Sequence, residues 1–188
     1  MTATDALVPA QAAARLDDCT VIDVRTPGEY ASGHLPGAHN IPLDHLRTAL
    51  PALKAAAARG TLLLVCASGN RSATARTELA AAGVPAATLV GGTTAWAGEG
   101  RTLHRPDGAT RVWPMERQVR LAAGALVVLG LAVGTRRRPA RLLSAAVGGG
   151  LVLSAATDTC GMAAVLAKLP YNQPRTADLH ATLRALRG

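Results

Sequence analysis

Three short apolar runs in the first half of the chain predict buried β-strands. They are Thr20–Val24, Leu62–Cys66 and Ala87–Val90, and each is rich in apolar or β-branched residues. Two Ala- and Leu-rich stretches with helical spacing, Leu43–Arg59 and Ser72–Ala82, separate these runs. Strands that alternate with helices indicate an α/β fold in which helices flank a parallel sheet.

Two longer apolar segments follow in the second half. No charged residue occurs from Leu121 to Thr135, and Asp158 is the only one from Leu142 to Ala167. A membrane-spanning helix needs about 20 apolar residues, and the uncharged part of the first segment has 15. Extension back through Val119 and Arg120, with arginine stems snorkelling to the interface at both ends, could make up the difference. We therefore expect a transmembrane helical hairpin. The alternative is a buried helical hairpin in a soluble protein.

Glycine and proline residues from Gly98 to Gly108 interrupt any regular element between the two halves. This break predicts four parts: an α/β domain over 1–105, a linker and interfacial segment over 106–118, a two-helix transmembrane hairpin over 119–170, and a C-terminal tail over 171–188.

The formal net charge of +8 is unevenly distributed. Lys and Arg outnumber Asp and Glu by nine to eight over residues 1–105 and by eleven to four over residues 106–188. The arginines flank apolar runs and no aromatic-rich basic patch accompanies them, so we predict a membrane and no nucleic acid as the partner. Basic residues on the two sides of the hairpin nearly balance, so charge alone does not orient it.

The first eighteen residues have neither the basic start nor the apolar core of a secretory signal. We therefore expect the α/β domain to stay in the cytoplasm. The spacing of the three cysteines, Cys19, Cys66 and Cys160, fits neither a zinc site nor a disulfide framework. We predict no metal and no organic cofactor.

Cys66 ends the second predicted strand and opens a loop that leads into a helix. Backbone N–H groups in such a loop, together with the helix N-terminus, form an anion site. Arg71 offers a cation, and Gly69 lets the loop curl around the sulfur. A thiolate there would be stabilised, reachable and nucleophilic; the alternative is an inert thiol at the end of a strand. The predicted cradle comprises Ala67, Ser68, Gly69, Asn70, Arg71 and Ser72.

The pattern Cys66-x-x-Gly69-x-Arg71 resembles the active-site loop of the rhodanese family. Two further segments are similar to family elements, namely Val21–Pro42 (VIDVRTPGEYASGHLPGAHNIP) and Leu89–Trp96 (LVGGTTAW). The resemblance implies a rhodanese-like parallel sheet and a Cys66 persulfide. This persulfide would carry sulfane sulfur from thiosulfate or a low-molecular-weight persulfide to cyanide or a thiol. The residues of the first segment that carry the likeness are Asp23, Arg25, Glu29, Gly33, His34, Pro36 and Gly37.

The loop also separates this activity from its alternatives. Four residues lie between Cys66 and Arg71, one fewer than in cysteine-dependent phosphatases, and the smaller ring of N–H groups favours a sulfur atom over phosphate or arsenate chemistry. A non-catalytic sensor of persulfides or thiol modification, or a sulfur-relay adaptor at the membrane, is the alternative from another class. We expect Asp23 and Arg25 to form a supporting ion pair beside the loop.

From Glu116 to Asn172 the chain resembles the two-helix segment that accompanies a single rhodanese domain in some bacterial inner-membrane proteins. ERQVRLAAG and TDTCGMAAVLAKLPYN carry this likeness. It implies a multi-pass anchor in the inner (plasma) membrane that could form a homodimer. The glycines at 130, 134 and 148–150 allow close helix packing within the hairpin or between copies. Cys160 could accept sulfur from Cys66; alternatively, Asp158 caps a helix and Cys160 is an apolar filler.

Overall fold

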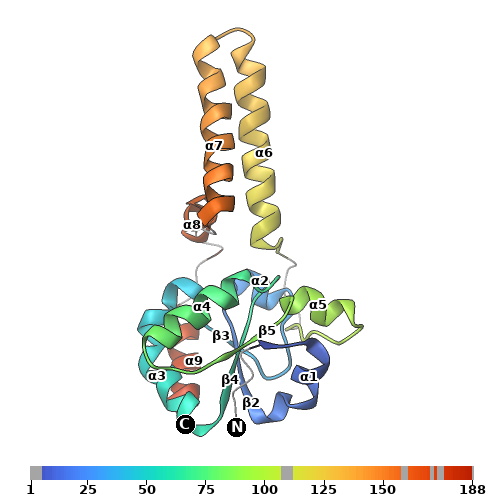
Figure 1. Ribbon diagram of the computed structural model, residues 1–188, viewed down its shortest axis with the longest axis vertical. Helices are drawn as coiled ribbons and strands as arrows, with labels where there is room; N and C mark the ends of the chain where they lie inside the picture. The colour runs from blue at the N-terminus through green and yellow to red at the C-terminus, as the bar shows by residue number, and fades with distance from the viewer. Residues whose placement is uncertain (1–5, 107–111, 158–160, 170–171, 173–175, 188) are drawn as a thin grey trace. The chain divides into compact units, whose positions relative to one another are not determined.

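The computed structural model describes residues 6–106, 112–157, 161–169, 172 and 176–187 (Figure 1). The chain divides into two compact units. The first comprises Met1–Val112 together with Pro174–Gly188, and the second comprises Trp113–Gln173.

The first unit is built on a five-stranded sheet in the order β1-β5-β4-β2-β3, and every pairing between neighbouring strands is parallel. The three predicted strands are present with ends that differ by one residue. The two edge strands were missed, because two residues are too few to show a periodicity. The strands are β1 (Ala6–Leu7), β2 (Cys19–Asp23), β3 (His39–Asn40), β4 (Thr61–Val65) and β5 (Ala87–Leu89).

Helices cover both faces of this sheet (Figure 1). Both predicted helices are present, although the first is preceded by a separate 3-10 turn at Leu43–His45 and the second begins two residues early, at Asn70. Another 3-10 turn spans Leu16–Asp18. The helices are α1 (Pro9–Ala14), α2 (Pro27–Ala31), α3 (Leu46–Arg59), α4 (Asn70–Ala81), α5 (Gly92–Gly98) and α9 (Thr176–Arg187).

The core lies in two layers, one on each side of the sheet. Along β4, Leu62 and Leu64 face α3, α4 and α9, whereas Leu63 and Val65 face α1 and α5. A strand buried on both faces needs a continuous apolar run rather than alternation with polar residues, which is why Leu62–Val65 is wholly apolar. Cys66 follows on the α3 and α4 side.

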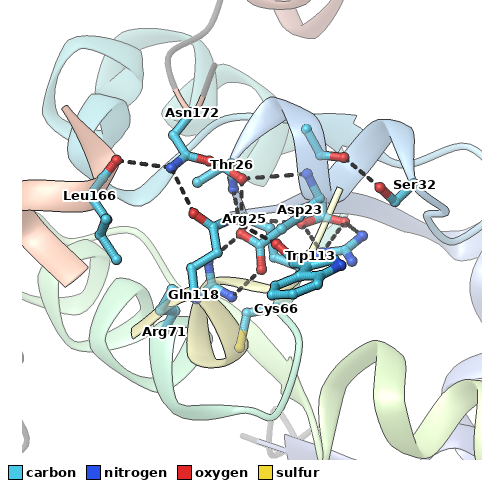
Figure 2. A network of polar contacts seen from close by, with 12 residues as sticks. Asp23, Arg25, Thr26, Ser32, Cys66, Arg71, Trp113, Gln118, Leu166 and Asn172 are labelled. Atoms are coloured by element: carbon cyan, nitrogen blue, oxygen red, sulfur yellow. Dashed lines mark hydrogen bonds and ion pairs between the residues drawn. The ribbon is translucent and has the colours of Figure 1, made fainter. Parts of the chain in front are cut away.

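The second unit contains α6 (Met115–Gly134), a 3-10 turn (Arg138–Ala140), α7 (Arg141–Thr157) and α8 (Gly161–Ala167). The apolar segment predicted over 142–167 is therefore divided between α7 and α8. Asp158 and Cys160 lie outside the described residues. Near the start of α6, Asn172 Nδ2 donates to Gln118 Oε1 at 3.3 Å, and Gln118 Nε2 donates to the Trp113 carbonyl at 2.7 Å (Figure 2).

Two helical stretches of this unit, Met115–Gly134 and Arg138–Thr157, are long and apolar enough to cross a membrane, each with a mean hydropathy of 1.4. Within the apolar part of each stretch, only 17% of the first and 0% of the second is buried. Large side chains such as Val128 and Val152 are exposed. Because a soluble hairpin would cover these side chains, their exposure favours lipid as the surrounding medium.

Glycines of α6 allow close contact with α7. A Cβ on Gly130 would lie 2.5 Å from Ser144 Oγ, and a Cβ on Gly134 would lie 2.5 Å from the Arg141 side chain. Ser144 Oγ also donates across the two helices to the Val127 carbonyl at 2.9 Å. Within the described part of the chain, a Cβ at positions 148–150 would meet nothing within 4 Å. The first two glycines therefore pack the hairpin, and dimerisation through 148–150 stays a prediction.

Candidate active site

Cys66 follows β4, the central strand, at the carboxyl edge of the parallel sheet, where ligand sites of open α/β sheets lie. Its side chain is fully buried, at 0% exposure. The outer side of the loop, at Ser68 and Asn70, is exposed. The thiol is therefore not exposed in this structure, and the access of a sulfur donor to it stays a prediction.

Two groups of the loop contact the sulfur. The Gly69 N–H donates to Cys66 Sγ at 3.1 Å, and Ser72 Oγ lies 3.5 Å from the same atom. Ser72 Oγ also donates to the Gly69 carbonyl at 2.9 Å. Gly69 has a φ of +109°, which a residue with a side chain rarely adopts. The loop thus curls back on the sulfur at the N-terminus of α4, where N–H donors and the helix dipole favour negative charge.

The first turn of α5, which follows β5, supports this loop. The N–H groups of Thr93 and Thr94 donate to the carbonyls of Cys66 at 2.8 Å and Ala67 at 3.0 Å. Gly92 has a φ of +58°, and a Cβ on it would overlap the Cys66 carbonyl oxygen. Only glycine fits this approach, which gives a physical reason for the second glycine in the Gly-Gly element of the sequence.

Arg71 links the loop to α2. Its Nη1 and Nη2 atoms donate to Glu29 Oε2 and Oε1, each at 2.8 Å. The Glu29 side chain is 2% exposed, and Oε2 also accepts from the N–H and the hydroxyl of Thr26, as in a capping box. Figure 2 shows Arg71 and Cys66 beside this polar network. The Arg71 guanidinium, which was predicted to be part of the anion cradle, thus binds a buried carboxylate. Contact between Arg71 and a substrate stays a prediction.

The predicted ion pair between Asp23 and Arg25 is present and buried. Arg25 Nη2 lies 2.6 Å from Asp23 Oδ2 and donates to the Gly33 carbonyl at 2.8 Å (Figure 2). Burial lowers the pKa of the Arg25 guanidinium, but the Asp23 carboxylate outweighs it and the net pKa is raised. Asn40 Nδ2 donates to the carbonyls of Asp23 and Arg25 at 3.0 and 2.9 Å. These contacts give the pair a supporting role beside the loop.

His34 has structural partners. Its ring stacks on Tyr30 with centroids 3.8 Å apart, and its Nδ1 lies 3.0 Å from the Tyr30 carbonyl oxygen. Burial lowers the pKa of His34, which favours the neutral ring. His34 also pairs through its backbone with His104. Among the described residues, no group of three His, Cys, Asp or Glu side chains could hold a metal ion.

Glu29 is the site residue that reasoning from the sequence missed. It entered the sequence analysis only through the family likeness, although Thr26-x-x-Glu29 is a recognisable capping pattern. That pattern explains the bond to Thr26. It gives no sign of Arg71, which lies 42 residues further along the chain.

Two family models match this chain. The model of the rhodanese-like domain matches residues 8–99. The model of the transmembrane domain of YgaP-like inner membrane proteins matches residues 113–174. The protein slr1261 of Synechocystis sp., which is uncharacterized, is 37% identical over 161 residues, covering 84% of this chain and 86% of that protein. The chain belongs to the rhodanese-like family. It is a membrane-associated member with a YgaP-like transmembrane domain, and the predicted architecture is confirmed.

Solved structures are similar to the first part of the chain. The crystal structure of a rhodanese-related protein from Thermoplasma volcanium is 30% identical, covers 54% of this chain and 98% of that chain, and has a TM-score of 0.50. A rhodanese-like domain protein from Staphylococcus aureus is also 30% identical, with coverages of 55% and 100% and a TM-score of 0.48. The first of these confirms the predicted fold class.

Proposed function

We propose that this membrane-associated rhodanese-like protein is a sulfurtransferase that carries sulfane sulfur as a persulfide on Cys66. One observation carries the proposal: the Gly69 N–H donates to Cys66 Sγ at 3.1 Å, at the N-terminus of α4. An N–H directed at sulfur stabilises a thiolate, which is the nucleophilic form of cysteine. The loop residues Ala67–Ser72 would surround the transferred sulfur atom.

The proposed reaction has two half-reactions. The Cys66 thiolate attacks the outer sulfur of thiosulfate, an S–S bond to Sγ forms, and the bond to the sulfonate sulfur breaks as sulfite leaves with its electron pair. Cyanide, or a thiolate acceptor, then attacks the terminal sulfur of the persulfide. Thiocyanate or a new persulfide leaves, and the Cys66 thiolate is regenerated without any cofactor.

Loading requires the loop to move, because the Cys66 side chain has no exposed surface. The segment between Cys66 and Gly69 is the part that must shift, since Ser68 on its outer side is exposed. The Arg71–Glu29 pair would hold the helical end of the loop in place during this movement. Arg71 would then act mainly by positioning the loop around an anionic donor.

The membrane segment would hold this activity at the inner membrane, with the rhodanese-like domain in the cytoplasm. A reducing compartment suits a chain whose cysteines at 19 and 66 are free thiols. It would also supply thiols and low-molecular-weight persulfides as acceptor and donor. A homodimer would form through the glycines at 148–150, and Cys160 would relay sulfur from Cys66.

Turnover tests the proposal. Purified protein in detergent, given thiosulfate and cyanide, should produce thiocyanate over many cycles, and the Cys66→Ala variant should produce none. Cys19→Ala is the matched control and should keep its turnover. The complete burial of Cys66 favours one other candidate, a sensor that takes up a single sulfur and holds it. Production of thiocyanate that stops after one equivalent would support the sensor and contradict the enzyme.

A further inference from the structure

Helix α9, Thr176–Arg187, lies beyond both family matches, because the transmembrane match ends at residue 174. It nevertheless belongs to the first unit of the structure, where it packs against α3 (Figure 1). The chain therefore leaves the rhodanese-like domain before the hairpin and returns to it afterwards.

One face of α9 is part of the domain core. Leu183 and Leu186 are 7% and 2% exposed, and Leu179 packs against the same cluster, so these positions form a stripe at helical spacing. The other described side chains are mostly exposed, namely Asp178, His180, Ala181, Arg184, Ala185 and Arg187. A helix of 12 residues is marginal on its own in water. Its stability must come from this packing.

A polar contact fixes the end of the helix. Arg59, the last residue of α3, donates through its guanidinium to the carbonyl oxygens of Leu186 and Arg187. The last carbonyls of a helix have no partner within the helix, and a cationic side chain stabilises that end. Arg59 thus joins the C-terminal ends of α3 and α9.

We propose that the α9-facing surface of α3 is an intramolecular docking site, and that its occupant holds the C-terminus on the same side of the membrane as the rhodanese-like domain. The intervening chain must then cross the membrane an even number of times, which the two candidate spans satisfy. The docked helix also brings Arg184 and Arg187 to the side of the domain. Cytoplasmic flanks of membrane spans are enriched in Lys and Arg. The other basic residues on the two sides of the hairpin nearly balance, so Arg184 and Arg187 favour the cytoplasm as the side on which the domain lies.

Protease protection tests the shared side. The full chain is made with different epitope tags at its two ends, and inside-out and right-side-out membrane vesicles are treated with protease. Both tags should be lost in one kind of vesicle and both retained in the other. Loss of one tag and retention of the other in the same vesicles would overturn the proposal.

Hydrogen exchange tests the docking, independently of any sulfur transfer. In the full chain in detergent, α9 amides should exchange at least about tenfold more slowly than in a free peptide. Leu186→Asp should abolish this protection, whereas Ala185→Asp, a change at the adjacent exposed position, should leave it intact. Arg59→Ala, which keeps the apolar core, should reduce protection near the end of α9. If the α9 amides of the unmodified protein exchange as fast as those of the free peptide, the proposal is overturned.

The partner could instead be the α3 of a second copy. The wild-type chain is therefore mixed with the Leu186→Asp chain in detergent, and the mixture is diluted stepwise. Intramolecular docking predicts that α9 of the wild-type chain keeps its protection at every dilution. Protection that falls as the chain is diluted would overturn it in favour of an exchange of helices between copies.

Discussion

Both terminal nitrogens of Arg71 lie 2.8 Å from the two carboxylate oxygens of Glu29. This pair joins α4, which begins at the sulfur loop, to α2, on which Glu29 closes the N-terminal cap. The Glu29 side chain is 2% exposed and that of Arg71 is 20% exposed. An ion pair this sheltered from water is weakly screened by salt, so it can hold the helical end of the loop in one place.

Arg71→Ala should lower the free energy of unfolding of the rhodanese-like domain by on the order of 3 kcal/mol, because it leaves the buried Glu29 carboxylate without this cation. Glu29→Gln together with Arg71→Gln should cost less than Arg71→Ala alone, since the double variant leaves no charged side chain at either position 29 or position 71. Urea unfolding of the full chain in detergent measures both. Arg47→Ala, an exposed arginine on α3, is the control. Equal losses of unfolding free energy in Arg47→Ala and Arg71→Ala would contradict the account.

Gly92→Ala should disrupt the loop, because the new Cβ would overlap the Cys66 carbonyl oxygen and the backbone φ is +58°. We expect a loss of at least about 2 kcal/mol in unfolding free energy, together with lower sulfur-transfer activity. Gly98→Ala, in the same helix, meets nothing within 4 Å of the new Cβ. It should change stability by no more than about 1 kcal/mol. Similar effects of the two variants would show that the close approach at Gly92 is unimportant.

The sequence predicts the centre of the fold well and its edges poorly. β2, β4 and β5 are visible because buried parallel strands need continuous apolar runs, which β4 shows from Leu62 to Val65. β1 and β3, at two residues each, leave no such pattern. The sequence predicts only a tail where α9 lies, because the apolar positions of α9 are few and their role depends on the α3 surface that they cover.

The candidate site divides in the same way. The position of Cys66 after a strand and before a helix follows from local patterns, and so does the pairing of Asp23 with Arg25 two residues later. The partner of Arg71 does not, because contacts between distant segments depend on how the helices pack. Burial of the Cys66 sulfur was missed for the same reason.

Gly130→Val should weaken the hairpin, because a Cβ at this position already approaches Ser144 Oγ to 2.5 Å. Gly149→Val adds the same side chain to α7 where a Cβ has open space, so it should leave the hairpin intact. Loss of helicity during titration with sodium dodecyl sulfate measures hairpin stability. A greater effect at position 149 than at position 130 would mean that the close contact lies between copies of the chain.

Cys19 should be a poor competitor for thiol reagents near neutral pH. Burial raises the pKa of its thiol above the ordinary value, so its thiolate is present only at more alkaline pH, and the fraction that reacts should rise as pH increases past that ordinary value. Iodoacetamide labelling from pH 7 to pH 10, followed by peptide mass spectrometry, measures this. Strong labelling of Cys19 at pH 7 that does not increase with pH would contradict the prediction.

The central claim is that the sulfur of Cys66 takes up a second sulfur atom. The most direct measurement is mass spectrometry of the intact chain, and then of its peptides, after treatment with thiosulfate in detergent. The account predicts one added sulfur, located on the peptide that contains Cys66, absent from the Cys66→Ala variant and removed by cyanide. A chain that gains no sulfur, or gains it equally in the Cys66→Ala variant, would contradict the account.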